Sequence, residues 1–238
     1  MIVSALYSLD LFLLDLINQL AGNHYLTDKI VLGVSDNHLF KGGVIITLFW
    51  VMWFSNTNQP MRRRRQLAAT LGASAAAIVA ARGLANLLPF RSRPIHNPLI
   101  EVNAPLGMGP EILEGWTSFP SDHAVLFYTL GVGIWFASRK IGLIVLVYIT
   151  VVIALPRIYL GLHYPTDIIF GGVVGCLFAI GANFFGSRAP GKLTVRTEEW
   201  LKRYPGIGYG AAFVITFQLA ELFESTRYLA RQVSAVIF

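Results

Sequence analysis

Residues 157–167 read RIYLGLHYPTD and combine a cation, an imidazole and a carboxylate, contributed by Arg157, His163 and Asp167. Pro165 favours the first turn of a helix, so the spacing predicts His163 at a helix start and Asp167 one turn further on. The carboxylate can then hold one ring nitrogen of the histidine and leave the other free to attack or to accept a proton. The alternative is a buried loop arginine, a helix-start histidine and an aspartate that complements the helix dipole.

The composition indicates a membrane protein. Of the 238 residues, 55% are hydrophobic and only 13% are charged, whereas a soluble domain has about 25% charged residues. The net charge is +6, but the basic residues lie in short loops between apolar runs, which is typical of membrane topology and not of nucleic-acid binding. Cys176 is the only cysteine, so no intrachain disulfide can form. We therefore expect the lipid bilayer as a partner, and no nucleic acid.

The apolar runs predict an all-α, polytopic membrane helix bundle with about five or six transmembrane helices. The expected spans are 39–55, 66–88, 121–138, 141–155 and 165–186, and a last run, 207–223, could span or lie in the interface. Lys41, near the start of the first span, is expected to snorkel to the membrane boundary. Arg82, inside the second span, is costly in hydrocarbon unless it faces a polar interior.

The first apolar stretch, residues 3–22, carries Asp10 and Asp15. It lacks a basic n-region and a small-residue cleavage site, so we do not expect a signal peptide. Two carboxylates would be costly within a span, so we predict an N-terminal amphipathic helix lying in the interface. We divide the chain into a membrane-embedded domain, 1–186, and a basic cytoplasmic segment with a final apolar helix, 187–238.

Four successive arginines, Arg62 to Arg65, set the predicted topology because cationic loops stay in the cytoplasm. Each later span crosses the membrane once, so Arg139 and Lys140 also lie on the cytoplasmic side. The segment that begins at Arg188 lies there too. The loop after the second span and the stretch around His163 then fall on the opposite side. The prediction is a multi-pass protein of the plasma (inner) membrane with its pocket on the outer, periplasmic face.

Residues 120–123 read PSDH at the expected start of the third span. Ser121 is a natural N-cap, and exposed N–H groups at a helix start bind anions within reach of His123. The alternative is a proline-initiated, serine-capped helix whose Asp122 favours the dipole. Two histidines and the arginines of the outer loops on one membrane face suit the binding of a tetrahedral oxyanion. The arginines could instead be lipid headgroup contacts. The chain lacks HExxH and HxH spacing, so we expect no metal.

These stretches resemble the motifs of the type 2 phosphatidic acid phosphatase family, whose fold and site are shared with vanadium haloperoxidases. The family motifs are K-x6-R-P, P-S-G-H and S-R-x5-H-x3-D. Here they read NLLPFRSRP (86–94), PSDH (120–123) and PRIYLGLHYPTD (156–167). The resemblance covers residues 10–186, and the PSDH variant is similar to the bacitracin-resistance type of undecaprenyl pyrophosphate phosphatase.

The chain departs from the family pattern at three positions. Asn86 stands in place of the motif lysine, Asp122 in place of glycine and Pro156 in place of serine. Loss of the lysine removes a phosphate contact. Arg91, or Arg82 one helical turn below Asn86, is the candidate to replace it.

The resemblance implies phosphoryl transfer in two steps without a metal or other cofactor. His163 attacks phosphorus, oriented by Asp167, while His123 protonates the leaving oxygen and then activates water. The groups implied to hold the equatorial oxygens are Arg93, Arg157 and Ser121. The implied enzyme is a metal-independent lipid phosphatase whose substrate enters sideways from the bilayer.

The expected substrate is a polyprenyl (undecaprenyl) diphosphate, hydrolysed to the monophosphate through a phosphohistidine. Asp122 would repel a second anionic group unless an arginine neutralises it, and Arg91 could make room for a diphosphate. One alternative is a phosphatidic acid or phosphatidylglycerol phosphate phosphatase. Another is a non-catalytic lipid transporter or scaffold with the same fold. A haloperoxidase fits least, since those enzymes are soluble.

Overall fold

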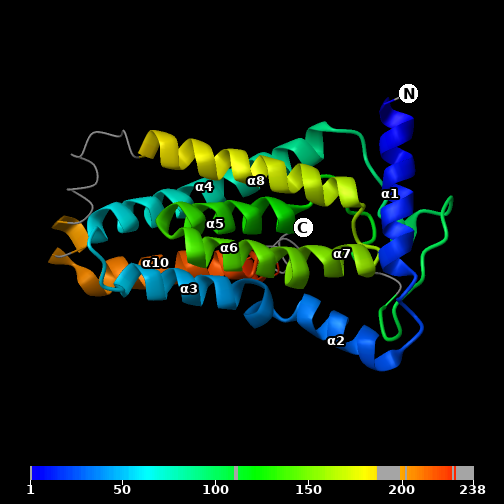
Figure 1. The fold of residues 1–238 in the computed structure, drawn as a ribbon, viewed down its shortest axis with the longest axis horizontal. Coiled ribbons are helices and arrows are strands. Elements are labelled where there is room, and N and C mark those ends of the chain that lie inside the picture. Colours follow the sequence, from blue (N-terminus) through cyan, green and yellow to red (C-terminus); the bar gives the residue numbers. More distant parts are fainter. Residues whose placement is uncertain (1, 110–111, 187–198, 202, 227, 229–238) are drawn as a thin grey trace, which may run out of the picture.

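The computed structural model describes residues 2–109, 112–186, 199–201, 203–226 and 228. Over these residues the chain forms a bundle of long helices that run side by side (Figure 1). The helices are α1 (Ile2–Asn18), α2 (Tyr25–Asp36), α3 (Val44–Phe54), α4 (Pro60–Leu87), α5 (Asp122–Ala137), α6 (Arg139–Tyr148), α7 (Leu155–Tyr159), α8 (Pro165–Gly186) and α10 (Pro205–Ala220). Short π-helical segments, η1 (Leu39–Gly43) and η3 (Ile149–Ala154), and a 3₁₀ turn, η2 (Pro94–His96), complete them. The predicted all-helical class is confirmed.

Helix α5 lies at the centre of the bundle and packs against α4, α6 and α8. Its residues are apolar on all sides, which is typical of a helix with no face in water. Small residues let the neighbours approach closely. A Cβ on Gly133 would lie 2.2 Å from the Thr70 side chain of α4, and one on Gly175 of α8 would lie 2.4 Å from the Val125 carbonyl. Larger residues at these positions would push the helices apart.

Three helical rods among the described residues are long and apolar enough to cross a membrane: α4, the continuous rod Arg139–Tyr159, and α8. The shorter apolar helices are Leu39–Phe54, Asp122–Ala137 and Pro205–Ala220. These elements fall where the sequence predicted the spans, and the chain is a multi-pass membrane protein. Two boundaries were wrong. Helix α4 begins at Pro60, so Arg62 to Arg65 lie on its first turns and not in a loop, and the fourth rod continues to Tyr159. Arg157 therefore lies on a helix and not in a loop.

Helix α1 lies across one end of the bundle, almost at right angles to the other helices (Figure 1). This is the orientation expected of a helix in the membrane interface. Its Asp10, however, does not face the lipid boundary. The carboxylate is buried, accepts hydrogen bonds from the Thr166 backbone N–H and hydroxyl, and pairs with Arg91. Asp10 thus fixes α1 to the start of α8.

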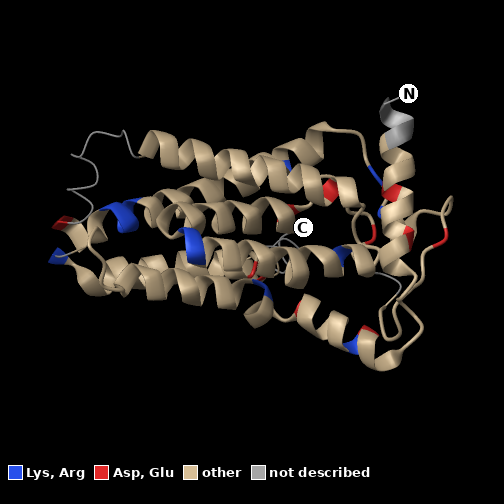
Figure 2. Cartoon of the chain, viewed as in Figure 1, with Lys and Arg blue, Asp and Glu red and all other residues tan. Residues whose placement is uncertain are grey.

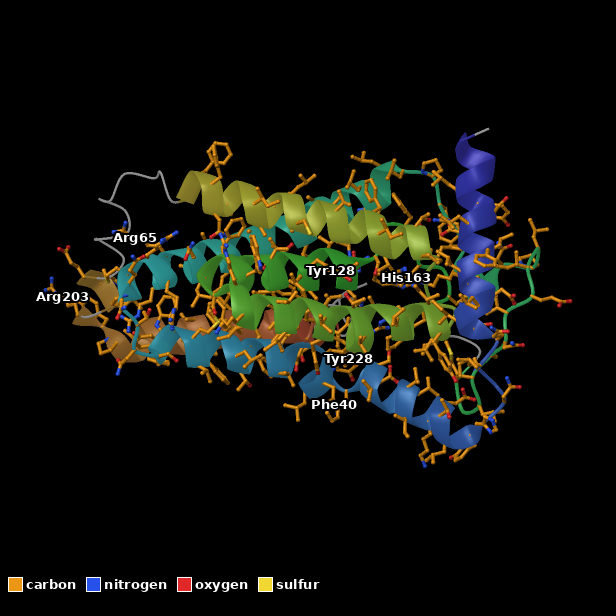
Figure 3. All side chains as sticks on the ribbon, viewed as in Figure 1. Phe40, Arg65, Tyr128, His163, Arg203 and Tyr228 are labelled. Atoms are coloured by element: carbon orange, nitrogen blue, oxygen red, sulfur yellow. The ribbon has the colours of Figure 1, made fainter. Side chains whose placement is uncertain are left out.

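The charged residues divide between the two ends of the bundle (Figure 2). Arg65 and Arg203 lie at one end, and His163 lies toward the other (Figure 3). Other basic residues of the polar segment, Arg188, Lys192, Arg196 and Lys202, lie outside the described residues. The separation of a cationic end from the end with the candidate site agrees with the predicted topology.

Helix α10 packs into the same bundle, against α3, α4 and η1. The Trp50 indole N–H donates to the Thr216 hydroxyl at 3.2 Å, and Leu219 belongs to the main hydrophobic core. The chain then turns through Leu222 and Phe223, both with φ near +55° to +58°. The last described residues thereby approach the end of the bundle that holds the candidate site.

Candidate active site

A cavity of about 610 Å³ is lined by His163, which lies in the half of the bundle away from Arg65 (Figure 3). That volume is in the range of sites for small molecules. Six of the predicted site residues line it: Arg82, Arg93, Asp122, His123, Arg157 and His163. They come from α4, the loop after it, α5, the end of α7 and the turn before α8. The cavity thus brings together six residues from segments that are far apart in sequence.

The partners of His163 define its tautomer. Its Nδ1 lies 2.8 Å from the Ser118 carbonyl oxygen, which can only accept, so Nδ1 carries the proton. Its Nε2 lies 3.1 Å from Nη1 of Arg93, which can only donate, so Nε2 presents its lone pair. The nitrogen with the lone pair is therefore held beside a guanidinium, where an anionic phosphate would bind.

The protonation state of His163 also suits attack. Burial lowers the pKa of His163 to about 4; the Asp167 carboxylate opposes this shift and the Arg93 charge adds to it. The imidazole is therefore neutral at physiological pH. A neutral imidazole is the nucleophilic form.

The sequence predicted that Asp167 would hold the His163 ring directly. In the structure it does not. Its nearer oxygen is 3.6 Å from Nδ1, and Ser118 lies between the two side chains. The Ser118 hydroxyl donates to Asp167 while its carbonyl accepts from His163. Asp167, wholly buried, also accepts from the Tyr164 N–H at 2.8 Å. Asp167 therefore positions the turn that orients the histidine, and Ser118 is the contact that the sequence analysis missed.

Arg91 is bound outside the cavity. Its guanidinium donates to Asp10 at 2.7 Å and to Asp167 at 2.5 Å, and it lies 4.0 Å from the centre of the Tyr164 ring. Because both carboxylates already neutralise it, Arg91 ties α1 to α8. The predicted role of Arg91 beside a second phosphate has no support from this placement.

Arg93 is buried and provides a donor that is not yet used. Nη1 donates to the Leu162 carbonyl at 2.7 Å and Nη2 to that of Thr117 at 3.3 Å, whereas the buried Nε has no hydrogen-bond partner among the residues that the structure describes. Burial lowers the pKa of Arg93 to about 10, with a contribution from the Arg157 charge, so the group remains cationic at pH 7. A buried donor without a partner is unusual and indicates a place for an oxyanion.

Arg157 connects the second histidine to the opposite wall of the cavity. One of its terminal nitrogens donates to Nε2 of His123 at 2.9 Å and to the Ser35 carbonyl, at the end of α2, at 3.3 Å. Arginine cannot accept, so Nε2 of His123 is an acceptor in this state. To act as an acid, His123 must first be released from Arg157 and gain a proton.

Besides Arg91, two residues predicted to bind phosphate do not line the cavity. Ser121 is the N-cap of α5, as predicted, but it is fully buried and its hydroxyl accepts from the Ala124 N–H at 3.4 Å. Asn86 is exposed on the last turn of α4. Neither placement supports direct contact with a phosphate in the cavity.

Arg82, the other candidate to replace the motif lysine, does line the cavity and forms an ion pair with Asp122. Its guanidinium also lies 5.0 Å from the centre of the Trp116 ring. The cation offsets the carboxylate that stands in place of the family glycine. Asp122 is therefore less repulsive toward a bound anion than the sequence suggested.

Two segments outside the motifs also line the cavity and were not predicted. Asp36 and Lys41 line the cavity from the α2–η1 segment, and Leu222, Glu224 and Tyr228 line it from the segment after α10. A signal for Lys41 was present, since a cation inside an apolar run usually faces a polar interior. Snorkelling was the wrong interpretation, because Lys41 is only 8% exposed and faces the cavity.

Comparison with known proteins agrees with this arrangement. Residues 88–188, which hold most of the site residues, match the PAP2 superfamily. The match covers less than half of the chain, and over these residues the chain is similar to that superfamily. The resemblance drawn from the three motifs is thereby confirmed.

Two relatives and one solved structure extend the comparison. The bacitracin transport permease protein BcrC of Bacillus licheniformis is 35% identical over 40% of this chain and 41% of its own. The putative undecaprenyl-diphosphatase YbjG of Escherichia coli (strain K12) is 32% identical over 36% of this chain and 43% of its own. The chain thus spans less than half the length of either relative. The crystal structure of Aquifex aeolicus LpxE has the same fold, with a TM-score of 0.50 and 21% identity over 73% of this chain and 94% of that one.

Proposed function

We propose that this PAP2 protein is a membrane-embedded phosphatase that hydrolyses a polyprenyl diphosphate, of the undecaprenyl class, to the monophosphate. The observation that carries the proposal is the position of the Nε2 lone pair of His163, which lies beside the Arg93 guanidinium in a cavity shared with His123 and Arg157. Such a cavity holds a nucleophile, an acid and two cations, which are the groups required for phosphoryl transfer through histidine.

In the first step, Nε2 of His163 attacks the terminal phosphorus, and the bond from phosphorus to the bridging oxygen breaks. Arg93 and Arg157 hold the equatorial oxygens and offset their developing charge. A bound phosphate would compete with His123 for the Arg157 guanidinium, which frees Nε2 of His123 to take a proton from solvent in the first turnover. The protonated His123 then passes this proton to the leaving oxygen. The products of this step are a phosphohistidine and a lipid monophosphate.

In the second step, water attacks the phosphohistidine, and His123 accepts the proton of that water. The nitrogen–phosphorus bond breaks, inorganic phosphate leaves, and His163 returns to its neutral form. No step requires a metal, because the two arginines supply the positive charge. That the reaction needs no metal is part of the proposal.

The substrate part of the proposal rests on the PSDH motif and on the name of the Escherichia coli relative. Phosphate release should be measured from purified protein with a polyprenyl diphosphate, phosphatidic acid and phosphatidylglycerol phosphate, each with and without a chelator. We expect the diphosphate to have the highest kcat/KM and the chelator to have no effect. An equal or higher kcat/KM for either phospholipid would reassign the substrate, and strict dependence on Mg²⁺ would contradict the mechanism.

The orientation is proposed from the separation of the cationic end from the cavity end, with the cavity on the outer face of the inner membrane. Single cysteines near Arg63 and near Asn103, with Cys176 removed, should react with an impermeant thiol reagent from opposite sides of the membrane. Reaction of both from the same side would contradict the proposed orientation.

A further inference from the structure

Lys41 is a buried cation in the cavity that neither the motifs nor the mechanism above assigns. It is 8% exposed and lines the cavity together with His123 and Arg157. Withdrawing an ammonium group from water is costly unless anionic groups accompany it. A phosphate cavity is therefore a favourable place for this side chain.

The fold sets the direction in which the Lys41 side chain points, because the residues before and after it, Phe40 and Gly42, both contact other helices. A Cβ on Gly42 would lie 2.3 Å from the backbone of Ala220, so η1 touches the end of α10 directly. On the other side, the Phe40 carbonyl accepts a hydrogen bond from the Tyr148 hydroxyl of α6. The π-helical turn changes the angular position of Lys41 relative to α3, and such turns often occur at functional sites.

Lys41 lies on the side of the cavity where the leaving group would be. Arg157 donates both to His123 and to Ser35, so the α2–η1 wall adjoins His123, whereas Arg93 contacts His163. In an in-line displacement the leaving group is opposite the nucleophile His163 and next to the acid His123. A cation on the α2–η1 wall would therefore face the group that departs.

We propose that Lys41 binds the second, lipid-linked phosphate of the substrate and so determines selectivity for diphosphates over monophosphates. This inference rests on the proposed phosphatase function. It also accounts for the missing motif lysine, since Asn86 is exposed and outside the cavity. In this chain the positive charge would come from Lys41 of η1 instead of the motif position on α4, and it would bind the phosphate that leaves with the lipid. The competing explanation is that Lys41 only offsets Asp36 and Glu224, which line the same cavity.

The experiment compares Lys41→Met and Lys41→Arg with wild type on a polyprenyl diphosphate and on phosphatidic acid. Lys140→Met, an exposed lysine at the first turn of α6, is the matched control. Loss of one charged hydrogen-bond partner predicts a drop of roughly 30-fold in kcat/KM for the diphosphate with Lys41→Met. Phosphatidic acid should change by less than about 3-fold, and Lys41→Arg should retain most diphosphate activity, since the charge is kept.

The ratio of the two substrates separates a specific role from misfolding. Equal losses on both substrates, or no loss on the diphosphate, would overturn the role of Lys41. If wild-type protein hydrolyses neither substrate, the proposed function fails, and Lys41 is then tested by ligand-induced changes in thermal unfolding. Inorganic pyrophosphate should raise the unfolding temperature of wild type more than orthophosphate does, and Lys41→Met should remove that difference. A difference that persists in the variant, or is absent from wild type, would overturn the inference.

Discussion

The two ends of the bundle are both rich in arginine but differ in burial. At one end, Arg62 and Arg65 are exposed on the first turns of α4. At the other, Arg93 and Arg157 are 6% and 5% exposed and donate to carbonyls and histidines. The exposed arginines form the denser run in sequence, yet solvent weakens each of their interactions. Burial and convergence, more than the number of cations, distinguish the end that can bind and transform an anion.

The largest expected effect is at the nucleophile. His163→Ala should reduce phosphate release by about 10³-fold or more, because no other group in the cavity is placed to attack phosphorus in the same way. His24→Ala, which changes an exposed histidine at the start of α2, is the matched control and should remain within about 2-fold. Turnover rates of the purified variants provide the measurement. Substantial activity in His163→Ala would place the nucleophile elsewhere.

The next largest effect on activity is expected from the difference between the buried Arg93 and the exposed Arg65. Arg93→Ala should lower kcat/KM by about 10²-fold, in line with the loss of one donor to a developing oxyanion. Arg93→Lys should not restore activity, because an ammonium cannot reach Leu162, Thr117 and the substrate together. Arg65→Ala should leave kcat/KM within about 2-fold. Similar losses at Arg65 and Arg93 would remove the distinction between the two ends.

The next prediction concerns Arg91, a cation that lies near the cavity but has a structural role. Arg91→Ala should lower the free energy of unfolding by about 2 kcal/mol, less than for a fully buried pair because the arginine side chain is 28% exposed. It leaves two buried carboxylates, Asp10 and Asp167, without their cation. Thermal unfolding measures the change, and kcat/KM should fall by the same factor for diphosphates and monophosphates. A selective loss on the diphosphate would instead restore Arg91 as a substrate contact.

The last prediction concerns the pH dependence. The pKa of His163 is lowered to about 4 from 6.5, so the folded protein binds fewer protons at this site than the unfolded chain between those pH values. Stability from this group is therefore complete above pH 6.5 and falls as pH decreases toward 4. The acidic limb of kcat/KM that reports this histidine should lie near pH 4. A limb near pH 6.5 would show that the imidazole is more solvated than in the structure.

Much of the fold followed from local pattern, because apolar runs and turn residues act over short distances. The predicted span 165–186 has the bounds of α8 itself, with Pro165 at its start. Ser121 caps α5 as its position before an apolar run suggested. The end of the fourth helix was missed, because Pro156 was taken as part of a loop and is tolerated in the first turn of α7.

The candidate site was predictable where the groups share a motif and less so where contacts cross the chain. The histidines and the cavity-lining arginines could be named, because the motifs place them at helix ends on one membrane face. The partners of these groups could not. The Ser118 contact to His163 spans 45 positions, and the Arg91 contact to Asp10 spans 81. Spacing along a helix reports on neighbours within one turn and gives no information about such pairs.

The sequence by itself therefore determined the helical membrane class and the order of the helices, and it named the candidate reactive groups. Apolar length, charge distribution and helix caps are properties of consecutive residues and can be read along the chain. Only the tertiary structure decided that Lys41 enters the cavity and that Arg91 is held by carboxylates outside it. The physical reason is that a buried charge takes its role from partners brought to it by packing, and packing joins residues that are distant in sequence.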